Sequence, residues 1–143
     1  MGEIEAIGRL VLAAVLGFII GLEREFAGQS AGERTHALVA LGSAAFTILS
    51  ITAFPGSDIS RVAAGVVTGL GFLGAGTILK DADTRIHGLT TAAGIWAVGA
   101  VGMAIGSGHY VLGLVAAVIT GAVLLSERFL RISERLARRS RPP

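Results

Sequence analysis

The chain alternates long apolar runs with short polar or charged stretches. A helix that crosses a hydrocarbon core of about 30 Å needs about 20 mostly apolar residues, so long gaps between ionisable residues predict membrane spans. Five such runs occur, near residues 6–22, 37–54, 62–79, 88–106 and 110–126. None alternates polar and apolar residues as membrane-barrel strands do. The pattern predicts an all-α, polytopic membrane protein with a five-helix transmembrane domain over residues 1–126.

The segment 127–143 has a different pattern, with apolar residues at helical spacing on one side and arginines on another. The apolar residues are Phe129, Ile132 and Leu136, and the arginines are Arg128, Arg131, Arg135 and Arg138. We predict a basic amphipathic helix that lies on the anionic lipids of the inner leaflet or continues the fifth span. The alternative is a docking site for another protein.

Composition excludes an ordinary soluble domain. Hydrophobic residues make up 52% of the 143 residues and charged residues 15%, whereas soluble domains carry about 25% charged residues. Cysteine is absent, which removes disulfides, thiolate metal sites and cysteine nucleophiles. The three histidines lack the spacing of zinc ligands. We expect no catalytic residue, no resident cofactor and no nucleic-acid partner.

The placement of basic residues predicts the orientation, because Lys and Arg concentrate in cytoplasmic loops. With the C-terminus inside, ten of the 12 Lys and Arg residues lie on the inner side, and two, Arg9 and Arg61, lie outside. The first apolar run follows Glu3 and Glu5 rather than positive charge, which is not typical of a cleaved secretory signal. We therefore expect the N-terminus outside and the C-terminus in the cytoplasm.

Glycines are abundant in the predicted spans. Spacings of four residues let helix backbones approach closely, which favours helix association in lipid. The glycines expected to pack in this way are Gly17, Gly21, Gly65, Gly69, Gly71, Gly74, Gly76, Gly102 and Gly106. The alternative for the third helix is that its many glycines let it bend or partly unwind, as broken helices in transporters do.

Charged and polar side chains gather at the inner helix ends. They are Glu23, Arg24, Glu25, Arg34, Thr35, His36, Lys80, Arg85 and His87. We expect Arg24 and Glu25 to continue the face of Gly17 and Gly21 into the bundle. The cluster is either an ion-pair network that fixes the loops or a pocket for an ion, an anion or a partner.

Two further sets of polar residues lie elsewhere in the predicted spans. Outside, Asp58 is expected to cap the third helix, with Arg61 pairing with it or extending to the interface. Thr90 and Thr91 lie within the fourth span but lack a neighbouring His or Lys that would activate a nucleophile. These hydroxyls therefore do not indicate catalysis.

Four motifs follow one another in fixed order. They are Gly21-Leu22-Glu23-Arg24-Glu25, the segment from Arg34-Thr35-His36 to Gly42, the segment from Arg61 to Gly76, and Gly88-Leu89-Thr90-Thr91-Ala92-Ala93 with Trp96. Together they resemble the membrane domain of the MgtC/SapB family. The chain is similar to the short SapB-like form, without the cytoplasmic C-terminal domain of MgtC proper.

The resemblance implies a bacterial inner-membrane protein linked to survival at low magnesium and, in pathogens, inside host cells. The family carries a magnesium-transport label, although its better-known members resemble regulators of membrane energetics that bind other membrane proteins, including ATP synthase. No Asp, Glu, Lys or Arg lies near the middle of a predicted span. We therefore favour a regulatory module over a small transporter or channel for magnesium or another ion. We expect Mg²⁺ to be a ligand or a transported ion of this protein and not a resident cofactor. The glycine faces of the helices predict a homodimer.

Overall fold

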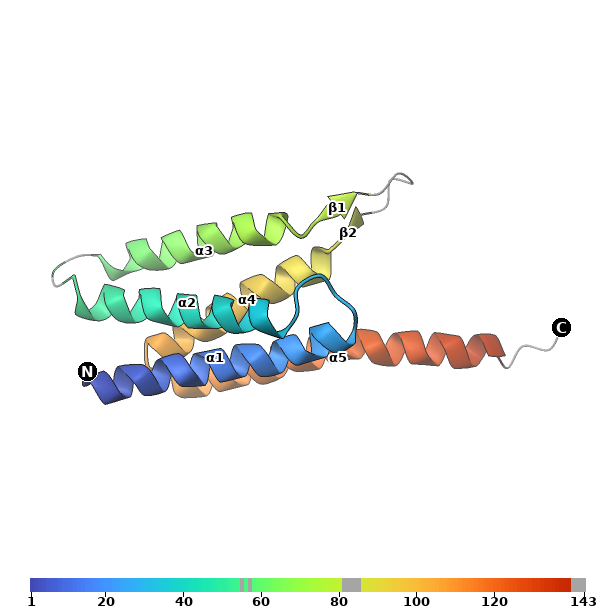
Figure 1. The fold of residues 1–143 in the computed structure, drawn as a ribbon, viewed down its shortest axis with the longest axis horizontal. Helices are drawn as coiled ribbons and strands as arrows, with labels where there is room; N and C mark the ends of the chain where they lie inside the picture. Colours follow the sequence, from blue (N-terminus) through green and yellow to red (C-terminus); the bar gives the residue numbers. More distant parts are fainter. Residues whose placement is uncertain (55, 57, 81–85, 140–143) are drawn as a thin grey trace.

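The computed structural model describes residues 1–54, 56, 58–80 and 86–139, with side chains up to Ser126. Within these residues the chain forms five helices: α1 (Glu3–Phe26), α2 (Glu33–Thr52), α3 (Ile59–Ala75), α4 (Leu89–Gly106) and α5 (Tyr110–Arg139). Two short strands, β1 (Leu79–Lys80) and β2 (Ile86–His87), pair antiparallel between α3 and α4 (Figure 1). The predicted all-α class and the number of helices are confirmed.

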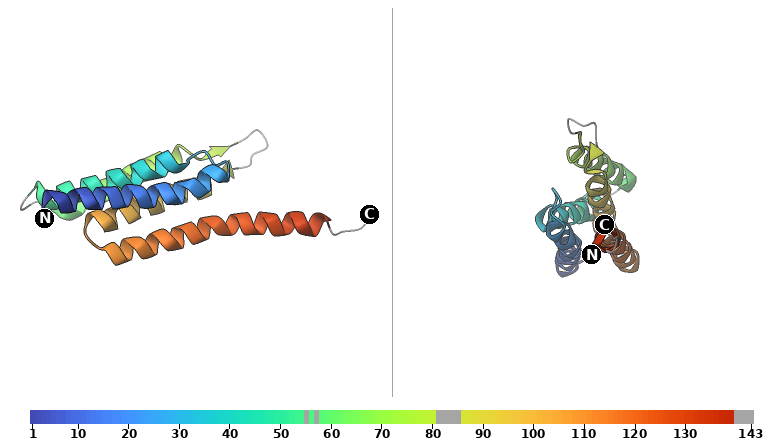
Figure 2. Two further views of the ribbon diagram at one scale, coloured as in Figure 1. Left: turned by 60° about the horizontal axis from the view of Figure 1, so that its bottom comes forward. Right: turned by 90° about the vertical axis from the view of Figure 1, so that its right-hand side faces the viewer.

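The helices form an elongated bundle. Figure 1 shows α1 and α2 side by side with α4 behind them, whereas α3 lies along one edge. Figure 2 shows α5 on the other side, with its C-terminal part projecting beyond the bundle. The interior holds small and branched apolar side chains: Ala13, Ile20, Ala40, Ala44, Ile95, Val98, Val101, Ile105, Ala117 and Leu124.

Helix α3 is shorter than predicted, because it ends at Ala75 and not at residue 79. Two glycines flank its last residue, and glycine is a poor helix former. The Thr77 hydroxyl and amide both donate to the Gly74 carbonyl, at 2.8 and 2.9 Å. These bonds satisfy the end of the helix and turn the chain into β1.

Helices α1, α2 and α5 begin or end beyond the apolar runs that predict them, whereas α4 stays within its run. Helix α2 begins at Glu33, four residues before the predicted start at 37, because a helix can begin with charged residues outside the apolar run. Helix α5 continues to Arg139 as one helix of 30 residues. The basic segment is therefore helical up to Arg139 and continuous with the fifth helix. The amphipathic character of this part stays a prediction from the sequence.

Several helices have the length and composition of membrane spans. Three helices, α1, α2 and α4, are long and apolar enough to cross a membrane, whereas α3 and the first part of α5 are apolar but shorter. The 17 residues of α3 reach about 26 Å. Large apolar side chains face outward, with Ile4 87% and Phe72 86% exposed. Soluble proteins rarely expose such continuous apolar surface, which a lipid bilayer would cover.

The predicted packing glycines fall into two groups. A Cβ at Gly17 would lie 2.5 Å from the His36 carbonyl oxygen, and one at Gly106 would lie 2.7 Å from that of Ala44. Gly21, Gly102 and Gly74 also lie against neighbouring helices or loops, and Gly76 lies in the turn after α3. In contrast, Gly65, Gly69 and Gly71 are exposed, and a Cβ there would meet nothing within 4 Å. These three glycines do not bring α3 against any described helix of the same chain.

Candidate functional site

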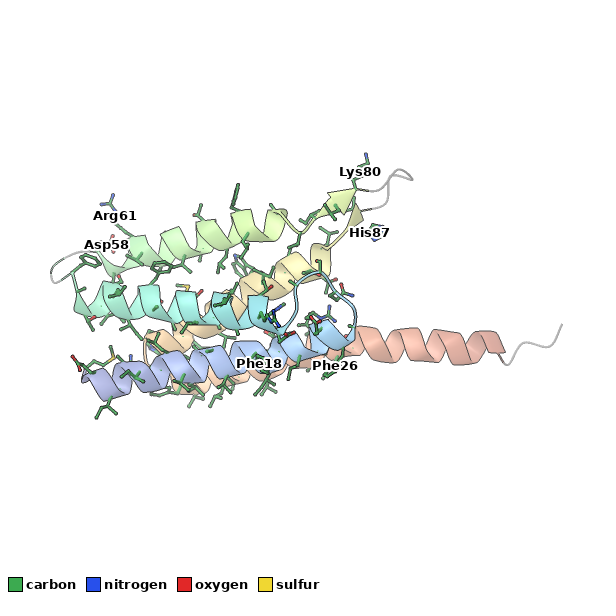
Figure 3. All side chains as sticks on the ribbon, viewed as in Figure 1. Phe18, Phe26, Asp58, Arg61, Lys80 and His87 are labelled. Atoms are coloured by element: carbon green, nitrogen blue, oxygen red, sulfur yellow. The ribbon has the colours of Figure 1, made fainter. Side chains whose placement is uncertain are left out.

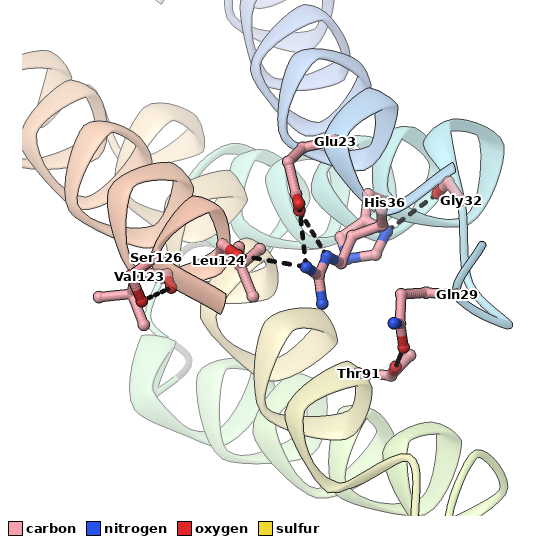
Figure 4. A network of polar contacts seen from close by, with 9 residues as sticks. Glu23, Gln29, Gly32, His36, Thr91, Val123, Leu124 and Ser126 are labelled. Carbon is pink, nitrogen blue, oxygen red and sulfur yellow. Dashed lines mark hydrogen bonds and ion pairs between the residues drawn. The ribbon is translucent and has the colours of Figure 1, made fainter. Parts of the chain in front are cut away.

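A buried guanidinium lies at the end of the bundle where α1 finishes. Arg24, in the last turn of α1, is only 1% exposed. Its Nε donates to Glu23 Oε2 at 2.6 Å, and one terminal nitrogen donates to Glu23 Oε1 at 3.1 Å and to the Leu124 carbonyl at 3.3 Å. A buried charge requires such partners, since water does not reach it. Arg24 thus joins α1 to α5 (Figure 4).

His36 lies in the first turns of α2 and is fully buried. Its Nδ1 is 2.9 Å from the Gly32 carbonyl oxygen, which requires the hydrogen to be on Nδ1 because a carbonyl only accepts. Within the described part of the chain, Nε2 is buried and has no hydrogen-bond partner. This nitrogen points toward Gly94, where an added Cβ would lie 3.5 Å away. Nε2 is therefore an unused acceptor at the contact between α2 and α4.

Thr91 and Gln29 complete the polar surroundings. Thr91, in the first turn of α4, is 1% exposed, and its hydroxyl donates to Gln29 Oε1 at 3.4 Å. The backbone N–H of Gln29 donates to the Arg24 backbone carbonyl at 3.0 Å. Polar side chains from α1, α2, α4 and the loop after α1 therefore meet at one end of the bundle. We call Glu23, Arg24, Gln29, His36 and Thr91 the polar cluster.

Other residues expected in this cluster lie outside it. Glu25 is exposed, so the expectation that it faces the bundle beside Arg24 is wrong. Its carboxylate lies against Gly32 instead. The Arg34 side chain is 91% exposed and is 3.6 Å from the Glu33 carboxylate. Thr35 is half-buried beside it, and Thr90 is exposed. The sequence predicts Glu25, Arg34 and Thr35 at this end of the bundle, where the structure has them, but it does not predict that Glu25 and Arg34 are exposed.

The residues between α3 and α4 do not join the cluster either. Lys80 and His87 are exposed on the β1–β2 hairpin, which carries them away from the end of α1 at Phe26 (Figure 3). Arg85 lies outside the described residues. The hairpin replaces the simple loop that the sequence suggests and separates these charges from the helix ends. Among the described residues, no group of three His, Cys, Asp or Glu side chains could hold a metal ion.

The opposite end of the bundle carries a helix cap. Asp58 Oδ1 accepts from the Ser60 amide at 2.9 Å and from the Ser60 hydroxyl at 2.6 Å, as expected for an N-cap. These hydrogen bonds stabilise the carboxylate and lower the pKa of Asp58. Arg61 is exposed, and no ion pair joins it to Asp58 within the described residues.

The contacts of Arg9 are not predicted from the sequence. Its guanidinium donates to the Gly106 carbonyl at 2.8 Å and to the Tyr110 hydroxyl at 3.1 Å, and it pairs with Glu5. The guanidinium carbon is also 5.6 Å from the centre of the Tyr110 ring. Arg9 thus ties α1 to the turn between α4 and α5. The available signal is a charge inside an apolar run with a carboxylate four residues before it.

These features define an α-helical membrane protein whose tightly packed apolar interior separates two polar ends. The chain belongs to the MgtC family, whose family model matches residues 10–132. The family expected from the four motifs is therefore confirmed. No solved structure matches the chain.

Curated relatives support the same assignment. The chain is 49% identical over 140 residues to "Putative magnesium transporter YhiD" of Escherichia coli, covering 92% of this chain and 64% of the relative. It is 45% identical over 125 residues to protein SrpB of Synechococcus elongatus, covering 78% and 69%. It is 41% identical over 127 residues to protein MgtC of Salmonella typhimurium, covering 87% and 54%. The chain thus spans about 64% of YhiD and 54% of MgtC.

Proposed function

We propose that this protein is a regulatory module of membrane energetics in the bacterial inner membrane, acting under magnesium limitation and during intracellular survival. The membership of the MgtC family and the name of the relative YhiD support the link to magnesium. In this proposal all five helices cross the bilayer, the N-terminus lies outside and the C-terminus lies in the cytoplasm. The basic end of α5 contacts anionic lipids.

The observation that carries the regulatory function is the packing between the two polar ends. Ala13, Ala40 and Val98 are fully buried in this region, and Gly102 of α4 lies directly against the Ala40 backbone. Interiors packed in this way contain few voids larger than a water molecule. A hydrated ion that crosses a single copy would have to separate these helices. This packing argues against an ion path through one copy and so favours a regulatory module over a carrier. Binding of other membrane proteins, such as ATP synthase, is what the family resemblance implies for such a module.

Transport of magnesium or another ion is the second candidate function. It is favoured by the name of YhiD, which is similar to this chain over 92% of its length. An ion path would then lie between copies of a homodimer, where the open glycine face of α3 offers a surface for association.

Growth in low magnesium tests the proposed link. Glu25→Asp and Arg34→Lys conserve charge at two exposed positions, so both variants should fold as the parent does. In a strain that lacks its own MgtC-family protein, we expect the parent to restore growth. If the cytoplasmic ends of the helices bind a partner or ligand, we expect the two variants to fail to restore it. Their folding is checked by thermal unfolding in detergent. Full growth with both variants would contradict a binding function for these two positions.

A further inference from the structure

A groove lies between α2 and α3 on the outside of the bundle. It has a volume of about 710 Å³, and apart from Arg34, Thr35 and Ser43 its lining residues are apolar or glycine. Gly42 on one wall and Gly65 and Gly69 on the other make it open, since a Cβ at each of these positions would meet nothing within 4 Å. Helix α3 contributes only one buried residue, Gly74, to the bundle. The groove is therefore a surface that the chain itself leaves uncovered.

The charge in this groove is at one end. Among the described residues that line it, Arg34 is the one charged side chain, and it is 91% exposed at the start of α2. The Glu33 carboxylate pairs with Arg34 at 3.6 Å, which is too long for a hydrogen bond, so the exposed N–H groups of the guanidinium can donate to another anion. The first turn of α2 has no side-chain cap, so the partial positive charge of its free amides lies at the same end, beside the Glu33 carboxylate.

The length of the groove indicates what fits it. From Arg34 to Phe46 along α2 the rise is about 18 Å. One leaflet of a bilayer contributes about 15 Å of hydrocarbon, half of the total of about 30 Å. A partner helix that crosses the bilayer would need a groove about twice as long. An acyl chain of one leaflet, with its headgroup at the charged end, matches both the length and the position of the charge.

We propose that the α2–α3 groove binds one anionic phospholipid, with its phosphate at Arg34 and Thr35 and an acyl chain beside Gly42, Gly65 and Gly69. The site differs from the basic end of α5, where contact with anionic lipids does not depend on a groove. The lipid site rests on the proposed location of the helices in the membrane. It does not depend on whether the protein regulates or transports. Lipid binding measured in detergent is therefore independent of growth and of ion flux.

The test is native mass spectrometry of the full chain in a neutral detergent, with phosphatidylglycerol or phosphatidylcholine of identical acyl chains. We expect the parent to retain one phosphatidylglycerol in preference to phosphatidylcholine. Arg34→Gln should weaken retention of phosphatidylglycerol about fivefold, the size of effect typical of an exposed ion pair. Arg61→Gln, which removes an exposed arginine at the other end, is the matched control and should leave retention unchanged.

A second pair of variants tests the groove itself. Gly69→Leu fills it, whereas Gly71→Leu adds the same bulk on α3 at a position that does not line it. A Cβ at either position has no other atom within 4 Å, so both variants should fold. We expect only Gly69→Leu to lose the lipid. Equal retention of both lipids, or retention unchanged by Arg34→Gln or Gly69→Leu, would overturn the proposal. Loss of a dimer rather than a lipid in Gly69→Leu would show that a second copy occupies the groove.

Discussion

The buried pair of Glu23 and Arg24 gives the sharpest stability prediction. Glu23→Gln keeps the shape of the side chain but removes the charge that Arg24 contacts through two hydrogen bonds. Arg24 stays 1% exposed and loses the carboxylate that accepts these two hydrogen bonds. Breaking a buried ion pair by removing one partner costs about 3–5 kcal/mol. Because the Glu23 side chain is 11% exposed, we expect a loss of about 3 kcal/mol, at the lower end of this range.

The assay is denaturant unfolding of the full chain in detergent micelles, followed by far-ultraviolet circular dichroism. Arg34→Gln is the matched control, since a 91% exposed side chain should contribute about 0–1 kcal/mol. The double variant Glu23→Gln/Arg24→Met removes both charges. Its loss of unfolding free energy should be smaller than the sum of the losses in the two single variants, with a coupling energy of about 2 kcal/mol. If Glu23→Gln costs no more than Arg34→Gln, the Glu23–Arg24 pair does not stabilise the fold as an ion pair around a buried guanidinium should.

Four further predictions follow from the fold. A reporter fused ahead of Glu3 should be active only as an outside marker and one after Arg141 only as a cytoplasmic marker, and both ends in one compartment would contradict an odd number of spans. Gly102→Leu should unfold at lower denaturant than Gly71→Leu in the same micelles, because Gly102 lies against the Ala40 backbone whereas Gly71 faces open space. Light scattering in detergent should give the mass of a homodimer, and a monomer would refute association of the parent protein. The Asp58 cap should be at full strength above the unfolded pKa of 3.8 and should weaken as the pH falls toward the lowered pKa of the folded protein. Amide exchange at the start of α3 measures this weakening. Asp58→Asn should abolish the pH dependence.

The sequence predicts the helices better than their ends. Long apolar runs determine where helices form, because each run must either enter lipid or be buried. The end of α3 depends instead on hydrogen bonds from Thr77 to Gly74, which an apolar run through residue 79 does not reveal. The hairpin of β1 and β2 has only two residues in each strand, too few for a periodic pattern to appear.

The candidate site shows the same limit. Arg24 and Glu25 follow one another, and helical geometry lets either lie near the face of Gly17 and Gly21. The structure buries Arg24, because the Leu124 carbonyl of α5 lies beside it, and leaves Glu25 exposed. This choice depends on how α5 packs, which spacing along α1 does not encode. For the same reason, the contact of Arg9 with the far end of α4 appears only once the helices are assembled.

Magnesium flux into liposomes tests the central claim most directly. The purified full chain is reconstituted into vesicles that contain a magnesium-sensitive dye, with protein-free vesicles and a folded Gly71→Leu variant as controls. A regulatory module with a tightly packed apolar interior should give the same magnesium entry as protein-free vesicles, with or without a membrane potential. Entry that exceeds this background, saturates with magnesium and scales with the amount of parent protein would contradict the regulatory account and establish transport.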